Sequence, residues 1–424
     1  MGTLPSAILL GTMTLSEELT WRGFVNQTTY KDITVLDGQP ITFYLGVDPS
    51  ADSMTIGNLA VVMMVRHFIA HGHKAVLLVG GATGMIGDPD GKKQERNLLT
   101  LEQIALNKQA IAAQYKQVLG DLPFELVDNY DWFKGVGYLD FLRDVGKHVP
   151  MRQMLGRDFV QSRLGEDGAG ISYAEFSYSL IQGYDFLHMH REMGVDLQLA
   201  GADQWGNSIT GVDLIRRLTG DEAHVWSAPL VVNKATGAKF GKSEDGAVWL
   251  DAAKTSPYDF YQFWLNVDDE GVEDYLKYYT LLSPEDVATL MDEFNANKAS
   301  RAAQKALAYE VTKIVHGEKV VGQVLKATEL LFGGQLLDDA GFTLIKNVFE
   351  STPIAADAPL LEAIVTLGLA SSNTEARRFV SEGAITVNND RITADKQALT
   401  ASDFHDGILV MRRGKNSVAV ARQQ

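Results

Sequence analysis

The feature that most constrains the fold of this chain is a strand–helix–strand pattern near its beginning, followed by a glycine-rich loop. Residues 41–46 form a short apolar run that ends at a glycine, and residues 59–71 carry apolar side chains at helical spacing. Residues 75–79 are again rich in valine and leucine and stop at Gly80 and Gly81. This order of segments predicts a parallel sheet that is buried on both faces. Ligands of such sheets bind beyond the carboxyl ends of the strands, where the glycine-rich loops lie.

The length of 424 residues exceeds what one compact core usually holds and predicts two or three domains. We expect an α/β domain with a Rossmann-like parallel sheet over residues 1–245 and an α-helical domain over residues 246–349. Residues 350–359 are predicted to be a linker, because alanine and two prolines interrupt the helical pattern there. Two helical stretches and short β-rich runs follow, which predict a small α+β domain over residues 360–424.

The charge balance excludes several classes of protein. The chain has 38 Lys and Arg against 54 Asp and Glu, a formal charge of -16, and no cysteine. A disulfide scaffold, thiol catalysis and a thiolate metal site are therefore excluded. The acidity also argues against a surface that binds nucleic acid everywhere, since phosphates require clustered cations. Residues 360–424 are nearly balanced, with eight basic and seven acidic side chains, so a local contact with RNA remains open.

The N-terminal segment is not typical of a targeting signal. Residues 1–12 carry no Lys or Arg, and their apolar run at residues 7–10 is shorter than the core of a signal peptide. No stretch approaches the ~18 apolar residues that a membrane span requires. We therefore expect a cytoplasmic protein that makes no membrane contact, in which Met13 would also serve as a start.

A turn of small residues, from Asp48 to Asn58, lies between the first strand and its helix. The backbone N–H groups and the dipole of a helix N-terminus attract an anion at such a turn. The same residues also fit an ordinary helix cap, with Ser53 or Thr55 as the N-cap and Gly57 allowing close packing. These residues alone leave both interpretations open.

The loop after the second strand contains four glycines within residues 80–87. Glycines allow a ligand to approach the backbone closely, and Asp88 would then be a carboxylate suited to a cation such as an α-ammonium group. The alternative is a tight loop whose glycines serve only its turns. Residues 91–96 follow as a basic loop that is suited to folding over phosphates.

A polar stripe lies on a predicted helix over residues 172–189. Gln182 and Asp185 follow Tyr178 by four and seven positions, which places all three on one face of that helix. They predict the polar wall of a pocket, and the alternative is a solvated face. Further along, residues 239–243 place two lysines around a glycine, a pattern suited to a loop that closes on a polyphosphate but also to a plain surface loop. His67 and His71 have the helical spacing of metal ligands, but no Glu or Asp lies between or just after them, so we expect no metal site.

Six strings together resemble the bacterial-type tyrosyl-tRNA synthetases, a family of class I aminoacyl-tRNA synthetases, from about Met13 onward. The strings are Tyr44-x-Gly46-x-Asp48-Pro49, Val79 to Pro89, Asn129-Tyr130-Asp131-Trp132, Tyr178 to Phe186, Asp203-Gln204-Trp205-Gly206-Asn207, and Lys239-Phe240-Gly241-Lys242-Ser243. Each string is modest alone, but six in the order and spacing of the family make the resemblance specific.

The resemblance implies a reaction in two steps. Tyrosine and ATP give tyrosyl-adenylate and pyrophosphate, and the tyrosyl group then moves to the 3′ end of tRNA(Tyr). The implied partners are L-tyrosine, tRNA(Tyr) and a second copy of the chain, with the interface of the homodimer around residues 133–157. ATP with Mg²⁺ is the implied cosubstrate, and no permanently bound cofactor is implied.

Roles for individual residues follow from the resemblance alone. Tyr44 and Asp185 would bind the phenol of the substrate, and Asp88, Tyr178 and Gln182 its ammonium group, with Asn129 and Gln204 close by. The implied ATP contacts are Gly46, Asp48, Ser50, Gly57, Gly201, Asp203 and Lys242. The implied catalytic residues of the mobile loops are Lys92, Arg96, Lys239, Lys242 and Ser243.

One string departs from the family, whose signature His-Ile-Gly-His reads Thr55-Ile56-Gly57-Asn58 in this chain. Asn58 keeps a neutral donor, whereas the hydroxyl of Thr55 is shorter than an imidazole and carries no charge. We hypothesise that Thr55, Asn58, the helix N-terminus and the loop cations suffice for an active but slower enzyme. The rival hypotheses are a catalytically silent protein that binds tyrosine or RNA for regulation, and a synthetase for another aromatic amino acid.

Residues 360–424 resemble the small S-four-type RNA-binding domain that ends these enzymes. A predicted helix within them carries Arg377 and Arg378, which would contact phosphates without reading bases. The alternative is a solvated helix face. By the same resemblance, the helical residues 246–349 would lie on the anticodon side of the tRNA.

Overall fold

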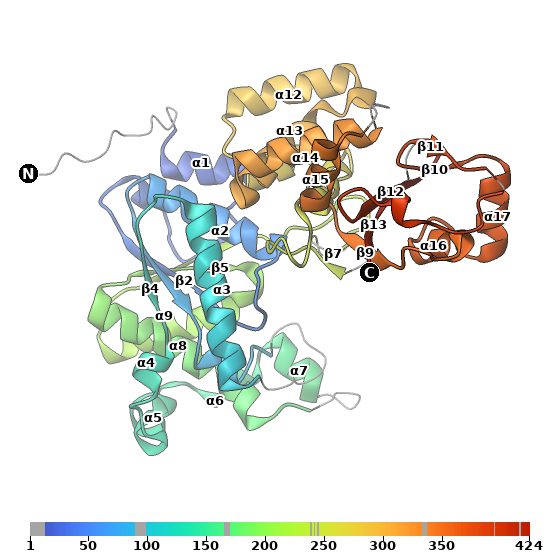
Figure 1. The fold of residues 1–424 in the computed structure, drawn as a ribbon. Coiled ribbons are helices and arrows are strands. Elements are labelled where there is room, and N and C mark those ends of the chain that lie inside the picture. Colours follow the sequence, from blue (N-terminus) through green and yellow to red (C-terminus); the bar gives the residue numbers. More distant parts are fainter. Residues whose placement is uncertain are drawn as a thin grey trace, which may run out of the picture. The chain divides into compact units, whose positions relative to one another are not determined.

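The computed structural model describes residues 13–89, 99–164, 170–237, 240, 242–243, 246–332, 337–393, 395–414 and 417–424 (Figure 1). The chain divides into two compact units, which are considered separately. The first unit comprises Met1–Leu250 and Val267–Leu307, and the second comprises Asp251–Asn266 and Ala308–Gln424.

In the described residues of the first unit, six strands form a central sheet with the order β1-β6-β5-β2-β3-β4. Neighbouring strands from β6 through to β4 are parallel, and β1 is antiparallel to β6. The strands are β1 Gln27–Thr28, β2 Thr42–Val47, β3 Lys74–Val79, β4 Phe124–Val127, β5 Leu197–Gly201 and β6 His224–Ala228. The prediction of a Rossmann-like parallel sheet is therefore confirmed.

Helices cover both faces of this sheet, as the consecutive buried side chains of β2, β3 and β5 require. Tyr44, Val76 and Leu78 share a buried cluster with Phe186 of α8, which spans Tyr173–Met193. The next side chain along β2, Phe43, points to the other face and lies against Phe68 of α2, Ile56–Ala70. Both faces of the sheet are buried. A ligand is therefore expected to bind beyond the carboxyl ends of the strands.

The other described helices and strands of the first unit surround this core. They are α1 Leu15–Arg22, α3 Leu101–Leu119, α4 Tyr130–Phe133, α5 Tyr138–Asp144, α6 Met151–Leu155, α7 Asp158–Leu164, α9 Trp205–Leu218, β7 Lys242–Ser243, β8 Gly246–Ala247, α11 Val272–Tyr279 and α12 Pro284–Ala296. A further helix, α13 Ala302–His316, crosses the division between the two units.

The second unit contains helices followed by a sheet with its own helices. Its described elements are α10 Pro257–Leu265, α14 Glu318–Phe332, α15 Asp339–Val348, β9 Ser351–Ile354, α16 Leu360–Thr366, α17 Asn373–Ser381, β10 Ile385–Val387, β11 Asp390–Arg391, β12 Ile408–Arg413 and β13 Ser417–Gln423. The strand order is β11-β10-β12-β13-β9, and a buried cluster that includes Leu360, Ile364, Ile385 and Leu409 joins the sheet to α16. The prediction of an α+β domain in the tail is confirmed.

The structure differs from the prediction of a linker at residues 350–359. Ser351–Ile354 form β9, which pairs in parallel with β13 from Val420 to Gln423. Pro353 is compatible with this strand because β9 lies at the edge of the sheet, where one side needs no donor. The pairing partner lies about 70 residues later in the chain, so the local sequence gave no sign of it.

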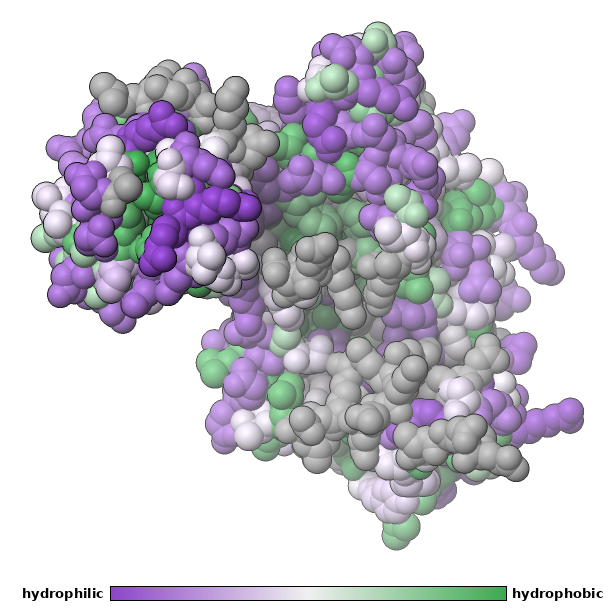
Figure 2. Space-filling view, turned by 90° about the vertical axis from the view of Figure 1, so that its right-hand side faces the viewer, coloured by the Kyte–Doolittle hydropathy of each residue, from purple (hydrophilic) through white to green (hydrophobic). Residues whose placement is uncertain are grey.

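Hydrophilic side chains dominate the face of the molecule in Figure 2, with hydrophobic residues scattered among them. Among the described residues, no helix combines the length and the apolar character that crossing a membrane requires.

Candidate active site

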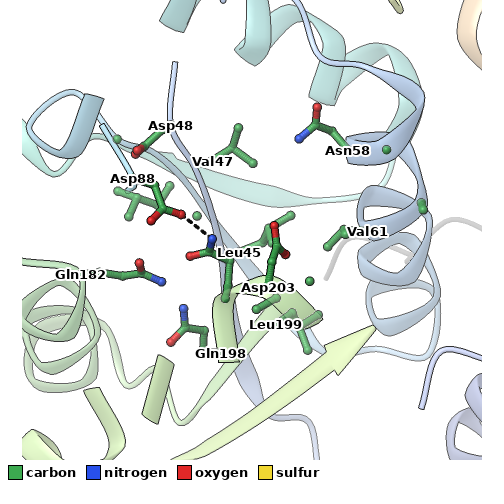
Figure 3. A pocket seen from close by; sticks show the side chains of 18 of the residues that line it. Leu45, Val47, Asp48, Asn58, Val61, Asp88, Gln182, Gln198, Leu199 and Asp203 are labelled. Carbon is green, nitrogen blue, oxygen red and sulfur yellow. Dashed lines mark hydrogen bonds between the residues drawn. The ribbon is translucent and has the colours of Figure 1, made fainter. Parts of the chain in front are cut away.

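A cavity of about 340 Å³ lies at the carboxyl ends of β2 and β5, in the first unit (Figure 3). It is lined by the end of β2, the start of α2, the loop after β3, one face of α8 and the segment after β5. The predicted site residues that line it are Tyr44, Gly46, Asp48, Ser50, Thr55, Gly57, Asn58, Asp88, Tyr178, Gln182, Asp185, Gly201, Asp203 and Gln204. Residues from five separate stretches of the sequence therefore meet in one place.

Helix α8 carries the polar stripe that the sequence predicted. The helix begins after Ser172, whose hydroxyl accepts from the N–H of Glu175, while the Glu175 side chain accepts from the Ser172 N–H. This capping box fixes where the helix begins. Tyr178, Gln182 and Asp185 all face the cavity, so the interpretation as a pocket wall holds and the solvated face is excluded.

The deep end of the cavity holds two buried polar groups. Asp185 is fully buried, and its carboxylate accepts hydrogen bonds from Asn129 Nδ2 at 3.0 Å and from Trp132 Nε1 at 2.9 Å. Burial raises the pKa of Asp185 to about 8, and the two donors oppose that rise. The hydroxyl of Tyr44 is buried without a hydrogen-bond partner among the described residues. A ligand with a hydroxyl would satisfy both groups, because burying an unpaired polar atom is costly.

A carboxylate and several polar atoms line the middle of the cavity. Gln204 Nε2 donates to Asp88 Oδ2 at 2.5 Å, and the hydroxyl of Tyr178 donates to Asp48 Oδ2 at 2.7 Å. Gln182 Oε1 is buried without a partner in the described part of the chain. The Tyr178 hydroxyl, having donated its proton, keeps its lone pairs for a ligand. This arrangement of acceptors suits a cation.

The glycines of the loop after β3 are required by close packing. A Cβ on Gly80 would overlap Thr83 Oγ1 and Asp48 Oδ1, and a Cβ on Gly81 would overlap Asp128. At Gly46 the nearest atom to such a Cβ would be Leu78 Cδ2 at 3.5 Å, an ordinary contact. The packing of the protein thus explains Gly80 and Gly81, whereas it does not require a glycine at Gly46, which lines the cavity.

Thr55 and Asn58 interact at the start of α2. The Thr55 N–H and the Thr55 hydroxyl both donate to Asn58 Oδ1, at 3.0 Å and 3.1 Å. Because a backbone N–H can only donate, the atom that faces it must be the amide oxygen, and Asn58 Nδ2 is turned toward the cavity (Figure 3). Asn58 Nδ2 is therefore the donor that this signature turns toward the cavity. Thr55 fixes the orientation of the amide through its two hydrogen bonds.

The segment after the lysine loop is tied to the same signature. The Ile56 N–H donates to Val248 O at 3.1 Å, and the Leu250 N–H donates to Met54 O at 2.9 Å. Lys92, Arg96 and Lys239 lie outside the described residues. Lys242 and Ser243 belong to β7, but their side chains are also outside the description. Arg377 and Arg378 are exposed on α17 in the second unit.

Some residues of the site were not predicted. Trp132 donates a hydrogen bond to Asp185, and Thr83 accepts one from Asn129. Gln198 of β5 is 3% exposed and lies opposite Tyr44 in the sheet. Gln198 Oε1 lacks a partner among the described residues. A glutamine inside an apolar strand is the signal that would have identified it. In the described ranges, no group of three or more acidic, His or Cys side chains is placed to hold a metal ion.

Comparison with known proteins assigns the family. The family model "tRNA synthetases class I (W and Y)" matches residues 36–333, and a model for the C-terminal domain of tyrosine–tRNA ligases matches residues 343–420. The tyrosine–tRNA ligase of Bacillus caldotenax is 44% identical over 97% of this chain and 100% of its own length. The chain belongs to the tyrosine–tRNA ligases. The ligase of Rhodopirellula baltica is also 44% identical, over 97% of both chains.

Solved structures agree with this family. A truncated mitochondrial tyrosyl-tRNA synthetase of Aspergillus nidulans is 28% identical and covers 75% of this chain and 94% of its own, with a TM-score of 0.68. Tryptophanyl-tRNA synthetase of Plasmodium falciparum shares the fold at 14% identity over 77% of this chain and 87% of its own, with a TM-score of 0.54. Since the fold is common to both, it does not choose between tyrosine and tryptophan, and the side chains of the deep end must do so.

Proposed function

We propose that this chain activates L-tyrosine with ATP and transfers the tyrosyl group to tRNA(Tyr). The observation that carries the proposal is the buried pair at the deep end of the cavity, where Asp185 and the hydroxyl of Tyr44, unpartnered among the described residues, line one pocket. A phenol that binds there donates to the carboxylate and accepts from Tyr44. An indole or a phenyl ring lacks the hydroxyl and leaves both groups unpaired.

In the proposed complex, the ammonium group of tyrosine lies against Asp88, Gln182 and the hydroxyl of Tyr178. This places the substrate carboxylate toward the start of α2, where one of its oxygens attacks the α-phosphorus of ATP. The new bond is the mixed anhydride of the adenylate, the bond to the β-phosphate oxygen breaks, and pyrophosphate leaves. A carboxylate is already a nucleophile at neutral pH, so the residues of the site act by position and by electrostatics.

The nucleotide side of the cavity is proposed to hold ATP with its Mg²⁺. Gly46, Gly57 and Gly201 leave room for the nucleotide, and Asp48, Ser50 and Asp203 supply polar contacts. Lys92, Arg96, Lys239, Lys242 and Ser243 are proposed to neutralise the charge that develops on the phosphates, as the resemblance implies. Asn58 Nδ2 supplies a further donor at the same end.

The remaining parts are proposed to serve the tRNA. We assign residues 1–245 to catalysis, residues 246–349 to the anticodon side and residues 360–424 to RNA contacts by Arg377 and Arg378. A cytoplasmic homodimer is proposed, with the interface at residues 133–157. In that segment Tyr138 and Leu139 are 63% and 76% exposed, which a second copy of the chain would cover.

Tyrosine-dependent exchange of pyrophosphate into ATP tests the activation step, with phenylalanine and tryptophan as matched amino-acid controls. We expect exchange with tyrosine alone. No exchange above background would favour the silent, regulatory alternative, which the full-length likeness to named ligases does not favour. Binding of tRNA(Tyr) should weaken with added salt, and an Arg377→Gln/Arg378→Gln variant should show a smaller salt dependence.

A further inference from the structure

Four side chains form a continuous line of hydrogen bonds beside the cavity. Arg157, which lies between α6 and α7, donates from Nη1 to Asn207 Oδ1 at 2.5 Å. Asn207 Nδ2 donates to Gln204 Oε1 at 3.3 Å, and Gln204 Nε2 donates to Asp88 Oδ2 at 2.5 Å. The line thus runs from a cation outside the cavity to a carboxylate that lines it.

The direction of this line is determined by chemistry. A guanidinium group only donates, so the Asn207 atom that meets Arg157 must be the amide oxygen. The amide nitrogen of Asn207 then faces Gln204, which must present its own oxygen. Gln204 is left with its nitrogen toward Asp88, and an ionised carboxylate only accepts. Reversing either amide would set two donors or two acceptors against each other.

Arg157 is well held at its own position. Its Nη2 also donates to Gly206 O at 2.7 Å and to Thr210 Oγ1 at 2.5 Å, both in the first turns of α9. A planar guanidinium that bonds several acceptors of one helix has little freedom to move. Asn207 is 3% exposed, so water does not readily replace the bond that Arg157 makes to it. The line therefore has a rigid origin.

We propose that Arg157 and Asn207 are positioning residues for tyrosine, acting through Gln204 to orient the Asp88 carboxylate toward the substrate ammonium group. This inference rests on the proposed function, because Asp88 is assigned to the ammonium group there. Neither Arg157 nor Asn207 lines the cavity, so neither touches the substrate. Their loss should weaken the binding of tyrosine and leave the binding of ATP unchanged.

The test measures KM for tyrosine and for ATP separately in pyrophosphate exchange, together with the Kd of tyrosine by calorimetry. Arg157→Met removes the origin of the line, and Asn207→Asp keeps an acceptor for Arg157 but loses the donor to Gln204. In both variants we expect the KM and Kd of tyrosine to rise about tenfold, since an ordered hydrogen bond to a charged group is lost. Arg157→Lys, which keeps a cationic donor, should recover most of the affinity.

Arg217→Met is the matched control. Arg217 lies on α9, as Asn207 does, and donates from Nη1 to His148 O at 2.6 Å. It takes no part in the line of hydrogen bonds. This variant should bind both substrates as the wild type does. In a Gln204→Ala background, Arg157→Met should cause no further loss of tyrosine affinity.

Two results would overturn the inference while leaving the proposed function intact. One is an equal rise of both KM values in Arg157→Met, which indicates a general structural role. The other is an undiminished effect of Arg157→Met in the Gln204→Ala background. Absence of exchange by the wild type contradicts the proposed function instead, and the calorimetric Kd of tyrosine then still tests the line. A wild type that binds no tyrosine overturns both.

Discussion

At the deep end of the cavity Asp185 is fully buried and already accepts two hydrogen bonds, whereas at the phosphate end Asn58 is half-buried and Asp203 is exposed. The deep end lies within the described fold. The phosphate end carries the altered signature and, in the proposed function, depends on cations of two loops. On that proposal, recognition of the amino acid is built into the packed core, while the handling of phosphate is shared with loop residues. Four predictions test this contrast.

The largest effect is expected at the deep end. In Asp185→Asn, an amide replaces the acceptor that Asn129 and Trp132 both need, and the phenol loses its carboxyl partner. We expect kcat/KM for tyrosine in pyrophosphate exchange to fall about a thousandfold, since buried donors that are left without a partner are costly. Asp121→Asn, at an exposed carboxylate outside the proposed interface, is the control. A loss below tenfold would mean that the deep end does not decide recognition.

A smaller loss is expected from Asn58→Asp at the phosphate end. The oxygen that accepts from Thr55 is retained, so the helix cap and Tm should be unchanged, but the donor toward ATP is replaced by a negative charge. We expect kcat/KM for ATP to fall about a hundredfold, in the range seen when one transition-state donor is removed. Unchanged kinetics would show that Asn58 only caps α2.

Thr55→Val should have a milder effect, because the Thr55 N–H still holds Asn58 Oδ1 when the hydroxyl is gone. We expect about a fivefold loss in kcat/KM for ATP, the equivalent of one neutral hydrogen bond. Thr14→Val removes a comparable cap from α1 and should lower stability by about 1 kcal/mol without altering the kinetics. If both variants lose activity alike, Thr55 acts only through stability.

The last prediction concerns stability, which should change with pH. The pKa of Asp185 is raised from 3.8 to about 8 in the folded chain, so folding favours the protonated form. The stability that this proton gives is fully present below pH 3.8 and is lost as the pH rises through about 8. Asp185→Asn does not titrate, so the Tm of this variant should rise relative to the Tm of the wild type as the pH increases from 5 to 9. A Tm difference that is constant over this range contradicts the raised pKa.

Local pattern was sufficient wherever a regular element carries the information. Short apolar runs at residues 41–46 and 75–79 predicted β2 and β3, and helical spacing placed Tyr178, Gln182 and Asp185 on one face of α8. Both patterns depend only on backbone geometry over a few residues. The resemblance then supplied roles for these side chains, most of which do line one cavity.

The partners of the supporting residues could not be predicted in the same way. Trp132 meets Asp185 across 53 residues, Arg157 meets Asn207 across 50, and β9 pairs with a strand at the far end of the chain. Trp132 belongs to a string that resembles the family, but neither that string nor the residues around Arg157 indicate which distant side chain each of them meets.

The amino-acid sequence was enough to establish the class of fold, the family and the chemical types of side chain at the site, because these depend on local periodicity and on short strings. The tertiary structure alone decided which polar atoms are paired, which remain unpartnered and which way each amide faces. Those properties arise from burial and from contacts between distant segments, where each donor must meet an acceptor.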